Sequence, residues 1–249
     1  LQIETKLANR VPAALTLKMK QAPELFVTGI AEVDTVLDGG IPRGCIIEVA
    51  GAASTGKTSF GLSAIAAITQ TGAACAWVDV SDTLSPESAA AAGVELKRLL
   101  WLRTSSERKQ KITNKPWPRL EQALKATDLL LQAGGFGAIV LDMSDVLPQH
   151  TMRIPLATWY RFRLAAEQAR TALIFLSQAP CAHSCAALAL RCEPASVRSF
   201  SSNGETALFE HQQYTLIRER SRNESSVFFQ KKPSLRAAWH AETLWSRVR

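Results

Sequence analysis

A glycine-rich run between residues 51 and 58 carries the clearest chemistry in the sequence. Gly51-Ala-Ala-Ser-Thr-Gly-Lys-Thr58 matches the pattern G-x-x-x-x-G-K-[ST]. Its glycines allow a backbone path that directs successive N–H groups at phosphate oxygens, and a helix beginning at Lys57 adds its positive dipole end. Lys57 can neutralise the β- and γ-phosphates, and the Thr58 hydroxyl can coordinate Mg²⁺. The predicted nucleotide-binding residues are Gly51, Ala52, Ala53, Ser54, Thr55, Gly56, Lys57, Thr58 and Ser59.

Two polar residues stand at the ends of apolar runs. Asp142 ends the predicted strand 137–142, and Gln178 follows the predicted strand 172–177. The carboxyl ends of parallel strands meet at one edge of a sheet, beside a phosphate loop of this kind. There Asp142 could hold the Mg²⁺ shell, with Asp145 a weaker candidate. The alternative is that Asp142 only caps a loop and Gln178 only begins one.

Strand and helix patterns alternate along the chain, and they must position these residues. The strands are apolar throughout, which is typical of a parallel sheet covered by helices on both faces. We predict an α/β fold with a mostly parallel central sheet flanked by helices, and with antiparallel strands at one edge. The predicted strands are 45–50, 74–80, 99–102, 137–142, 172–177, 187–192, 213–222 and 226–230, the helices 57–70, 86–92, 120–133 and 155–170, and the exposed loops 104–119 and 193–206.

Composition narrows the class of protein. The 249 residues carry a formal net charge of +7, which favours encounters with polyanions such as nucleic acid, although many basic proteins bind none. Five scattered cysteines indicate reduced thiols in the cytoplasm. No apolar run is long enough to span a bilayer, and the first residues carry charges where a signal peptide needs an apolar stretch. We expect a soluble cytoplasmic protein with no membrane partner.

We divide the chain into three parts. Residues 1–24 form a short amphipathic helix candidate and a linker, 25–230 the nucleotide-binding core, and 231–249 a basic C-terminal tail. Within the core, Thr28 is predicted to cap a short helix that carries apolar residues at helical spacing.

The order of these motifs resembles the core of bacterial RecA. The resemblance covers roughly residues 28–230 and implies a RecA-like P-loop domain that binds ATP and Mg²⁺. It also implies that Gln178 senses the γ-phosphate. The matching stretches are Thr28-Gly-Ile with Asp34, Gly39-Gly-Ile-Pro-Arg-Gly44, Glu48 with the phosphate loop, Trp77-Val-Asp-Val-Ser-Asp-Thr-Leu84, Pro86 with Ala91-Ala-Gly-Val94, and Phe175-Leu-Ser-Gln178.

Within this superfamily the chain resembles ImuA-type RecA paralogues of the bacterial translesion-synthesis mutasome. The stretches that carry this resemblance are 120–142 and 154–163. It implies an accessory role in error-prone DNA synthesis during the DNA damage (SOS) response. The implied partners are ImuB-like polymerase-type subunits, with RecA, weakly bound single-stranded DNA and further copies of this chain as additional candidates.

Departures from RecA bear on catalysis. The resemblance places a catalytic glutamate at the position of Ser81, and Asp82 beside it is a weak substitute. A positioned general base contributes about 10²–10⁴ in rate, so we expect weak or absent ATP hydrolysis. The adenine-contacting Asp and Tyr of the family correspond to Ser85 and Ser88. Among the remaining residues, Lys57 and Gln178 are the catalytic candidates.

The segment after Gln178 departs from RecA as well. Only residues 179–186 separate Gln178 from the next predicted strand, which is too short for a loop lying along a DNA strand. This argues against strand exchange. Further on, Arg220 and Arg222 match two family lysines that reach the ATP of a neighbouring subunit. The alternative, which we favour slightly, is a solvated basic edge strand.

Three other groups have a functional and a structural interpretation. Cys181, His183, Cys185 and Cys192 could bind zinc, but their spacing is awkward and thiols in the fold are the better interpretation. The basic stretch 103–119 with Trp117 could follow a nucleic acid backbone or be a solvated loop. The tail 231–249 could be a partner-binding helix or could pack on its own domain.

Two rival functions remain open from the sequence. One is an active DNA-dependent ATPase and recombinase that binds single-stranded DNA. The other is an interaction protein with a vestigial nucleotide site. ATP turnover separates the first rival from the accessory role, and a test of nucleotide binding separates the second.

Overall fold

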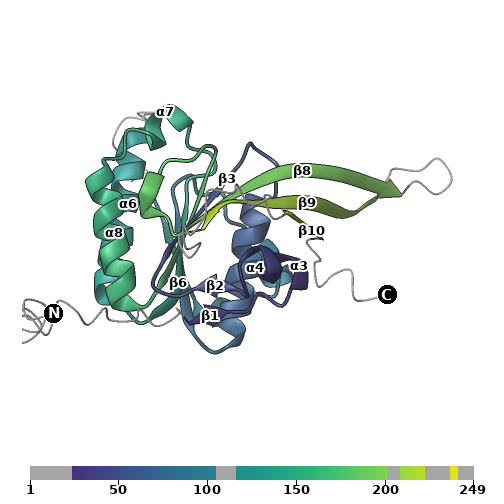
Figure 1. Cartoon of the computed structure of the whole chain (residues 1–249), viewed down its shortest axis with the longest axis horizontal. Helices are drawn as coiled ribbons and strands as arrows, with labels where there is room; N and C mark the ends of the chain where they lie inside the picture. Colours follow the sequence, from purple (N-terminus) through teal and green to yellow (C-terminus); the bar gives the residue numbers. More distant parts are fainter. Residues whose placement is uncertain (1–23, 105–115, 201–207, 222–235, 241–249) are drawn as a thin grey trace, which may run out of the picture.

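An eight-stranded sheet, in the order β10-β9-β8-β3-β7-β6-β4-β5, forms the centre of the molecule (Figure 1). The computed structural model describes residues 24–104, 116–200, 208–221 and 236–240. The strands from β8 to β5 are parallel to one another, whereas β9 and β10 are antiparallel additions at one edge. The strand bounds are β3 Ile46–Ala50, β4 Ala74–Asp79, β5 Leu99–Arg103, β6 Phe136–Asp142, β7 Ala172–Ser177, β8 Leu188–Phe200, β9 Leu208–Ser221 and β10 Arg236–His240.

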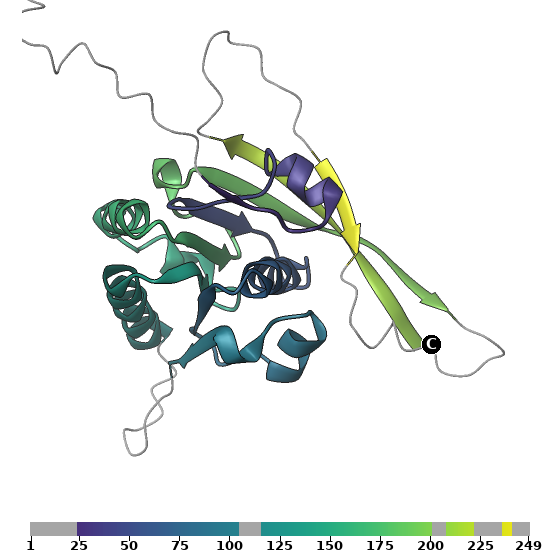
Figure 2. The same cartoon turned by 90° about the horizontal axis from the view of Figure 1, so that it is seen from below.

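Helices cover both faces of this sheet, as Figure 2 shows. One face holds α3 (Ala31–Val36), α4 (Lys57–Gln70) and α5 (Pro86–Ala91). The other holds α6 (Pro116–Ala133), the short α7 (Pro148–Thr151) and α8 (Leu156–Ala169). The predicted α/β fold, with its mostly parallel sheet and antiparallel edge, is confirmed.

The two faces explain why the central strands are apolar at every position. In β4, Cys75 and Trp77 join the core under α4, while Ala76 and Val78 join the core under α6 and α8. A strand covered on one side only would alternate apolar and polar residues. On the α8 side, the ring of Trp159 stacks on Phe175 of β7 with centroids 4.7 Å apart.

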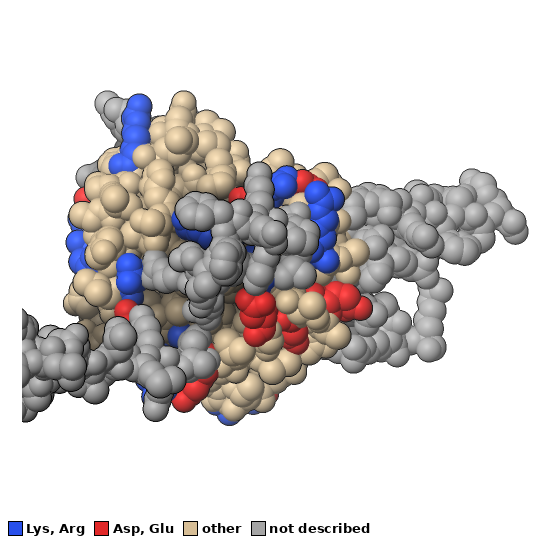
Figure 3. Space-filling view, in the orientation of Figure 1, with Lys and Arg blue, Asp and Glu red and all other residues tan. Residues whose placement is uncertain are grey.

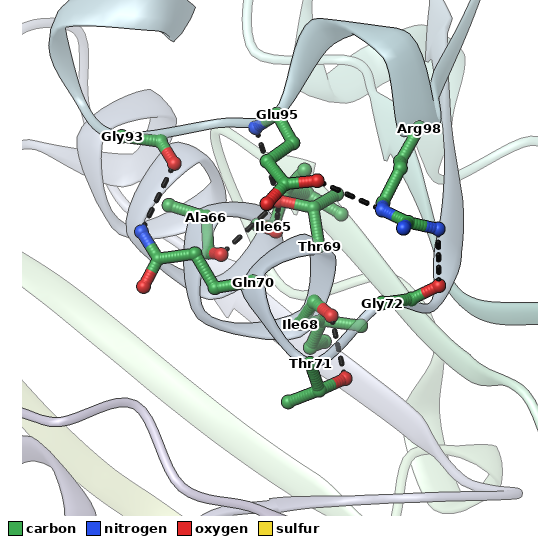
Figure 4. Close-up of polar contacts among 10 residues, drawn as sticks. All are labelled: Ile65, Ala66, Ile68, Thr69, Gln70, Thr71, Gly72, Gly93, Glu95 and Arg98. Carbon is green, nitrogen blue, oxygen red and sulfur yellow. Dashed lines mark hydrogen bonds and ion pairs between the residues drawn. The ribbon is translucent and has the colours of Figure 1, made fainter.

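Polar contacts fix the carboxyl end of α4, as Figure 4 shows. The Gln70 side chain donates to the Gly93 carbonyl at 3.1 Å, and the N–H of Glu95 donates to the Thr69 hydroxyl at 3.2 Å. The Arg98 guanidinium donates to the Glu95 carboxylate at 2.8 Å and to the carbonyl of Gly72 at 2.6 Å. These bonds tie α4 to the segment before β5, so they help to orient the helix whose other end carries the phosphate loop.

Several boundaries differ from the sequence predictions. Residues 193–200 were predicted as loop but continue β8, which with β9 forms a long hairpin that extends from the body (Figure 1). The prediction that Thr28 caps a helix was wrong. The cap residue of α3 is Ile30, and the Thr28 hydroxyl instead donates to Asp34 at 2.8 Å. The predicted loop 104–119 ends earlier, because α6 begins at Pro116.

Short elements that the sequence did not indicate complete the fold. Leu25–Phe26 (β1) and Ile41–Pro42 (β2) pair as a small antiparallel sheet on either side of α3 in the chain. Two 3₁₀ helices, Leu96–Arg98 and His183–Cys185, precede β5 and β8. None of the described helices is long and apolar enough to cross a membrane.

Candidate functional site

The register of the sheet brings the predicted site residues to one edge. Ala50 of β3 lies opposite Ser177 of β7, and Asp142 of β6 lies between Leu176 of β7 and Asp79 of β4. The four strands are neighbours and parallel, so they end at the same edge. The phosphate loop follows β3, Gln178 follows β7, and Asp142 ends β6, as the sequence predicted.

The phosphate loop is a tight turn between β3 and α4. The N–H of Gly51 donates to the Ser177 carbonyl at 3.1 Å, which joins the loop to the end of β7. The Thr55 hydroxyl donates to the Ala52 carbonyl at 2.9 Å. Gly56 has a φ of 87°, a left-handed conformation that costs glycine little. Thr58 at the start of α4 is exposed, so its hydroxyl is accessible to a ligand.

Lys57 folds back over this loop. Its ammonium donates to the carbonyls of Gly51 at 2.6 Å and Ala52 at 2.5 Å, and only 4% of the residue is exposed. Burial lowers the pKa of Lys57, while the charges of Asp142 and Asp145 oppose that shift. A cation held by loop carbonyls, with the charges of Asp142 and Asp145 nearby, is suited to phosphate groups entering over the loop.

Asp142 is a buried carboxyl group beside other acids. Burial, helped by the neighbouring charges of Asp79 and Asp145, raises its pKa from 3.8 to about 6, although the N–H of Ser144 donates to it at 3.0 Å. Only 4% of the residue is exposed. A buried carboxylate with acidic neighbours gains most from a cation, because no described side chain forms an ion pair with it.

Gln178 lies at the same edge, turned toward the end of β6. Its amide nitrogen donates to the Ser144 carbonyl at 3.0 Å, two residues beyond Asp142. This bond links the residue after β7 to the loop that carries the metal candidate. The role of Gln178 as a sensor for a bound phosphate stays a prediction.

Asp82 forms an ion pair at the β5 edge of the sheet. Its carboxylate pairs with Arg103 of the edge strand β5, at 2.5 and 2.7 Å, and Arg103 stacks over the Trp101 ring at 4.8 Å. The hydrogen bonds from Arg103 lower the pKa of Asp82. A carboxylate held in such a pair is a poor acceptor for a proton. Its weak candidacy as a general base therefore has little support, and Ser81 supplies no carboxylate.

Sequence reasoning missed two residues that close over the phosphate loop. The ring of Tyr214 in β9 packs so closely on Gly56 that a Cβ at this position would overlap it. Similarly, a Cβ at Gly51 would lie 2.6 Å from the carbonyl oxygen of Cys192 in β8. Packing therefore requires glycine at both positions, and the positive φ of Gly56 favours glycine there as well. No sequence signal sets the register of β8 and β9 against the loop.

The segment after Gln178 is held by a buried carboxylate. Glu48 of β3 is 2% exposed and accepts the N–H groups of Cys181 at 2.5 Å and Ala182 at 3.0 Å. Arg220 of β9 also donates to this segment, at the carbonyls of His183 and Ala186. Arg220 therefore contacts its own chain, and its action on a neighbouring subunit stays a prediction. Arg222 lies outside the described residues.

The cysteines near this segment are buried thiols. Burial raises the pKa of Cys192 to about 12 and that of Cys181 well above its ordinary value. The described residues contain no group of three or more His, Cys, Asp or Glu side chains placed to hold a metal ion. The suggested set of Cys181, His183, Cys185 and Cys192 is therefore not placed as a metal site. Thiols packed in the fold remain the better interpretation.

Parts of two further candidate regions are described. Trp117 lies in the first turn of α6 and is 38% exposed, whereas residues 105–115 of the basic stretch lie outside the described residues. In the C-terminal tail, Arg236–His240 forms β10 and pairs with β9, so this part packs on its own domain and extends the core beyond residue 230. The predicted strand 226–230 and the segment 1–23 also lie outside the description.

Comparison with known proteins finds similarity to RecA in both the family model and individual relatives. The model of the RecA N-terminal domain family matches residues 1–154. A Protein RecA of Acinetobacter baumannii is 34% identical over 142 residues, which cover 57% of this chain and 37% of the relative. A Protein RecA of Rhizobium leguminosarum bv. trifolii is 31% identical over 170 residues, covering 62% and 43%. The matches thus span about two fifths of the relatives' length.

Proposed function

The chain belongs to the RecA N-terminal domain family, and from this premise we propose that it binds ATP with Mg²⁺ at the phosphate loop and Asp142. The observation that carries the proposal is the meeting of three features at one sheet edge. These are a strand–loop–helix turn with left-handed Gly56, the buried ammonium of Lys57 and the buried carboxyl of Asp142.

The residues fit a magnesium-bound triphosphate. The turn at Gly56 and the first turn of α4 offer backbone N–H groups and a helix dipole to phosphate oxygens. Lys57 neutralises phosphate charge, while Thr58 and Asp142 would hold Mg²⁺. The metal supplies charge neutralisation for the phosphates when bound. Gln178 would contact the terminal phosphate and pass its presence to the segment that Glu48 anchors.

Hydrolysis is expected to be weak. A water molecule in line with the γ-phosphate needs a group that accepts its proton. Ser81 has no carboxylate, and Asp82 is paired with Arg103. Nucleotide occupancy, rather than turnover, then sets how the protein assembles or how tightly it holds a partner.

We place this activity in error-prone translesion DNA synthesis, as an ImuA-like accessory of polymerase-type subunits in the DNA damage response. Support comes from the short segment between β7 and β8. Residues 179–187 include a 3₁₀ turn, and its backbone is bound by the buried carboxylate of Glu48 and by the exposed side chain of Arg220. A segment fixed in this way lacks the reach of a loop that follows a DNA strand.

Thermal unfolding with and without a slowly hydrolysed ATP analogue and Mg²⁺ tests nucleotide binding. Ligand at 100 times its Kd should add about 2.7 kcal/mol, or roughly 5–10 °C for a domain of this size. Lys57→Ala should lose the shift. Lys125→Ala is the matched control, because it removes an equal charge from a side chain that is 72% exposed on α6. An unchanged melting temperature for the wild-type protein would favour an interaction protein with a vestigial site.

Two further assays separate the accessory role from a recombinase. ATP turnover should stay low with and without single-stranded DNA. Robust turnover that is stimulated by DNA and lost in Lys57→Ala would support the rival. Purified ImuB-like and replicative-type error-prone polymerase subunits should bind the chain, more tightly with the ATP analogue than without it. The same affinity with and without nucleotide would contradict the proposed coupling.

A further inference from the structure

Helix α8 carries large apolar side chains on two opposite faces. Trp159, Phe162 and Ala166 face the sheet and are fully buried. On the other side, Leu156 is 50% exposed, Tyr160 50% and Leu164 57%. A spacing of four residues places these three side chains in one stripe along the helix. The face with Trp159 packs on the sheet, whereas the face with Tyr160 packs on no other element among the described residues.

This stripe is large enough to matter for binding. Single exposed apolar residues are common, but contiguous ones on a helix mark interaction surfaces. Met152, just before the helix, adds a further side chain that is 62% exposed. Aromatic and arginine side chains are the residues most often found at energetic centres of interfaces. Here Arg163 stacks over the Tyr160 ring at 5.4 Å, which makes such a pair at the middle of the stripe.

Positive charge surrounds the stripe. At about 100° per residue, Arg163 lies on one side of it and Arg161 on the other. Arg161 pairs with Asp128 of α6 at 3.1 Å, whereas Arg153 and Arg163 form no ion pair with any described residue. Residues 152–170 contain four arginines and a single acidic residue, Glu167. In Figure 3 the surface on the side of α6 and α8 is mostly uncharged, with several Lys and Arg and fewer Asp and Glu side chains at its margins.

Charge also decides which occupant fits. A second copy of this face would bring arginines against arginines, which is unfavourable. The chain's own terminal segments also carry a net positive charge, which does not complement this face. Residues 1–23 contain four Lys and Arg and one Glu, and residues 222–249 contain six Lys and Arg and two Glu. An apolar stripe with a basic border is complementary to a helix with an apolar face and acidic flanks.

We propose that the exposed face of α8, formed by Leu156, Tyr160 and Leu164 with Met152, Arg153 and Arg163, docks an acidic amphipathic helix of a partner protein. This surface lies on the opposite side of the sheet from α4. The docking does not depend on the proposed nucleotide site.

Two designed peptides provide the test, with the full chain as the receptor. The first has Leu at helical positions i, i+3, i+4 and i+7 with Glu at its flanks, and the second has Lys in place of every Glu. Fluorescence anisotropy should show the acidic peptide binding at least about tenfold more tightly than the basic one, a difference of about 1.4 kcal/mol. Equal affinities would overturn the charge argument.

Substitutions locate the binding to α8. Leu164→Ala and Arg163→Gln should each weaken binding of the acidic peptide several-fold. Leu164 is exposed and Arg163 is partly exposed, so loss of folding is a minor risk, which urea unfolding checks. Leu96→Ala is the matched control, because Leu96 is 43% exposed on the 3₁₀ helix before β5. Unchanged binding by Leu164→Ala would overturn the proposal. Two other results would also overturn it, if the acidic peptide fails to bind. One is a dimer of this chain that Leu164→Ala abolishes, and the other is binding to phosphatidylserine vesicles that the same substitution abolishes.

Discussion

Replacement of Asp142 by Asn should stabilise the ligand-free protein at neutral pH. The Asp142 carboxyl is almost fully buried, and its pKa is raised from 3.8 to about 6. The native state therefore prefers the protonated group, whereas the unfolded chain ionises it near its ordinary pKa. Each pKa unit corresponds to about 1.4 kcal/mol, so ionised Asp142 costs the native state about 3 kcal/mol at pH 7.5. Asn keeps the acceptor for the N–H of Ser144 and removes the charge.

The difference in stability between Asp142→Asn and the wild-type protein should depend on pH. Between pH 3.8 and about 6 the native state binds more protons at this site than the unfolded state. The contribution of Asp142 to the free energy of unfolding therefore falls as the pH rises through that window and stays low above it. Asn does not titrate, so the advantage of the variant should be largest above pH 6 and should shrink toward pH 4.

Urea unfolding of both proteins at pH 7.5 and pH 4.5 measures this difference. We expect Asp142→Asn to be more stable by about 1–3 kcal/mol at pH 7.5, allowing for nearby Lys57, and by clearly less at pH 4.5. Comparison at each pH cancels the titration of other groups. A variant that is less stable than wild type at pH 7.5, or an advantage that is the same at both values, would refute the reasoning about this buried carboxylate.

Three further changes test the packing of the phosphate loop and of the elements that support it. Gly56→Ala should lower the free energy of unfolding by about 1–3 kcal/mol, because its Cβ meets the Tyr214 ring at a positive φ; wild-type stability in urea would show that the ring moves freely. Thr69→Val should cost about 1–2 kcal/mol, since the N–H of Glu95 loses its acceptor, and a neutral effect in thermal unfolding would mean that water replaces it. Trp159→Ala should cost about 3–5 kcal/mol through a cavity beside Phe175; a loss below 1 kcal/mol in urea unfolding would contradict the packing described.

Local signals in the sequence predicted the centre of the fold well. Helix 57–70 and strand 172–177 have the predicted ends, because a glycine turn begins the helix and a fully apolar run defines the strand. The positions of Asp142 and Gln178 at one edge followed from the parallel arrangement alone. These features depend on short stretches of chain and on one rule about parallel sheets.

Features that depend on distant pairing could not be predicted. The strand β8 continues through residues 193–200, where a loop was predicted from the polar run that begins at Ser199. It accommodates Pro194, because the ladder with β9 shifts register between Pro194 and Val197 and tolerates a residue without an N–H. The contact between Tyr214 and Gly56 depends on the register of β9. A local contact explains the error at Thr28. This residue has the side chain of a helix cap, but the carboxylate of Asp34, six residues along the chain, accepts hydrogen bonds from its hydroxyl and N–H instead.

Titration calorimetry with a slowly hydrolysed ATP analogue tests the central claim most directly. We predict one binding site per chain that requires Mg²⁺, with affinity at least about tenfold weaker in Lys57→Ala and in Asp142→Asn and unchanged in Lys125→Ala. The Asn variant is informative because it is expected to be the more stable protein, so its loss of binding cannot come from unfolding. Binding that is independent of Mg²⁺, or equal in all four proteins, would contradict the assignment of this sheet edge as a nucleotide site.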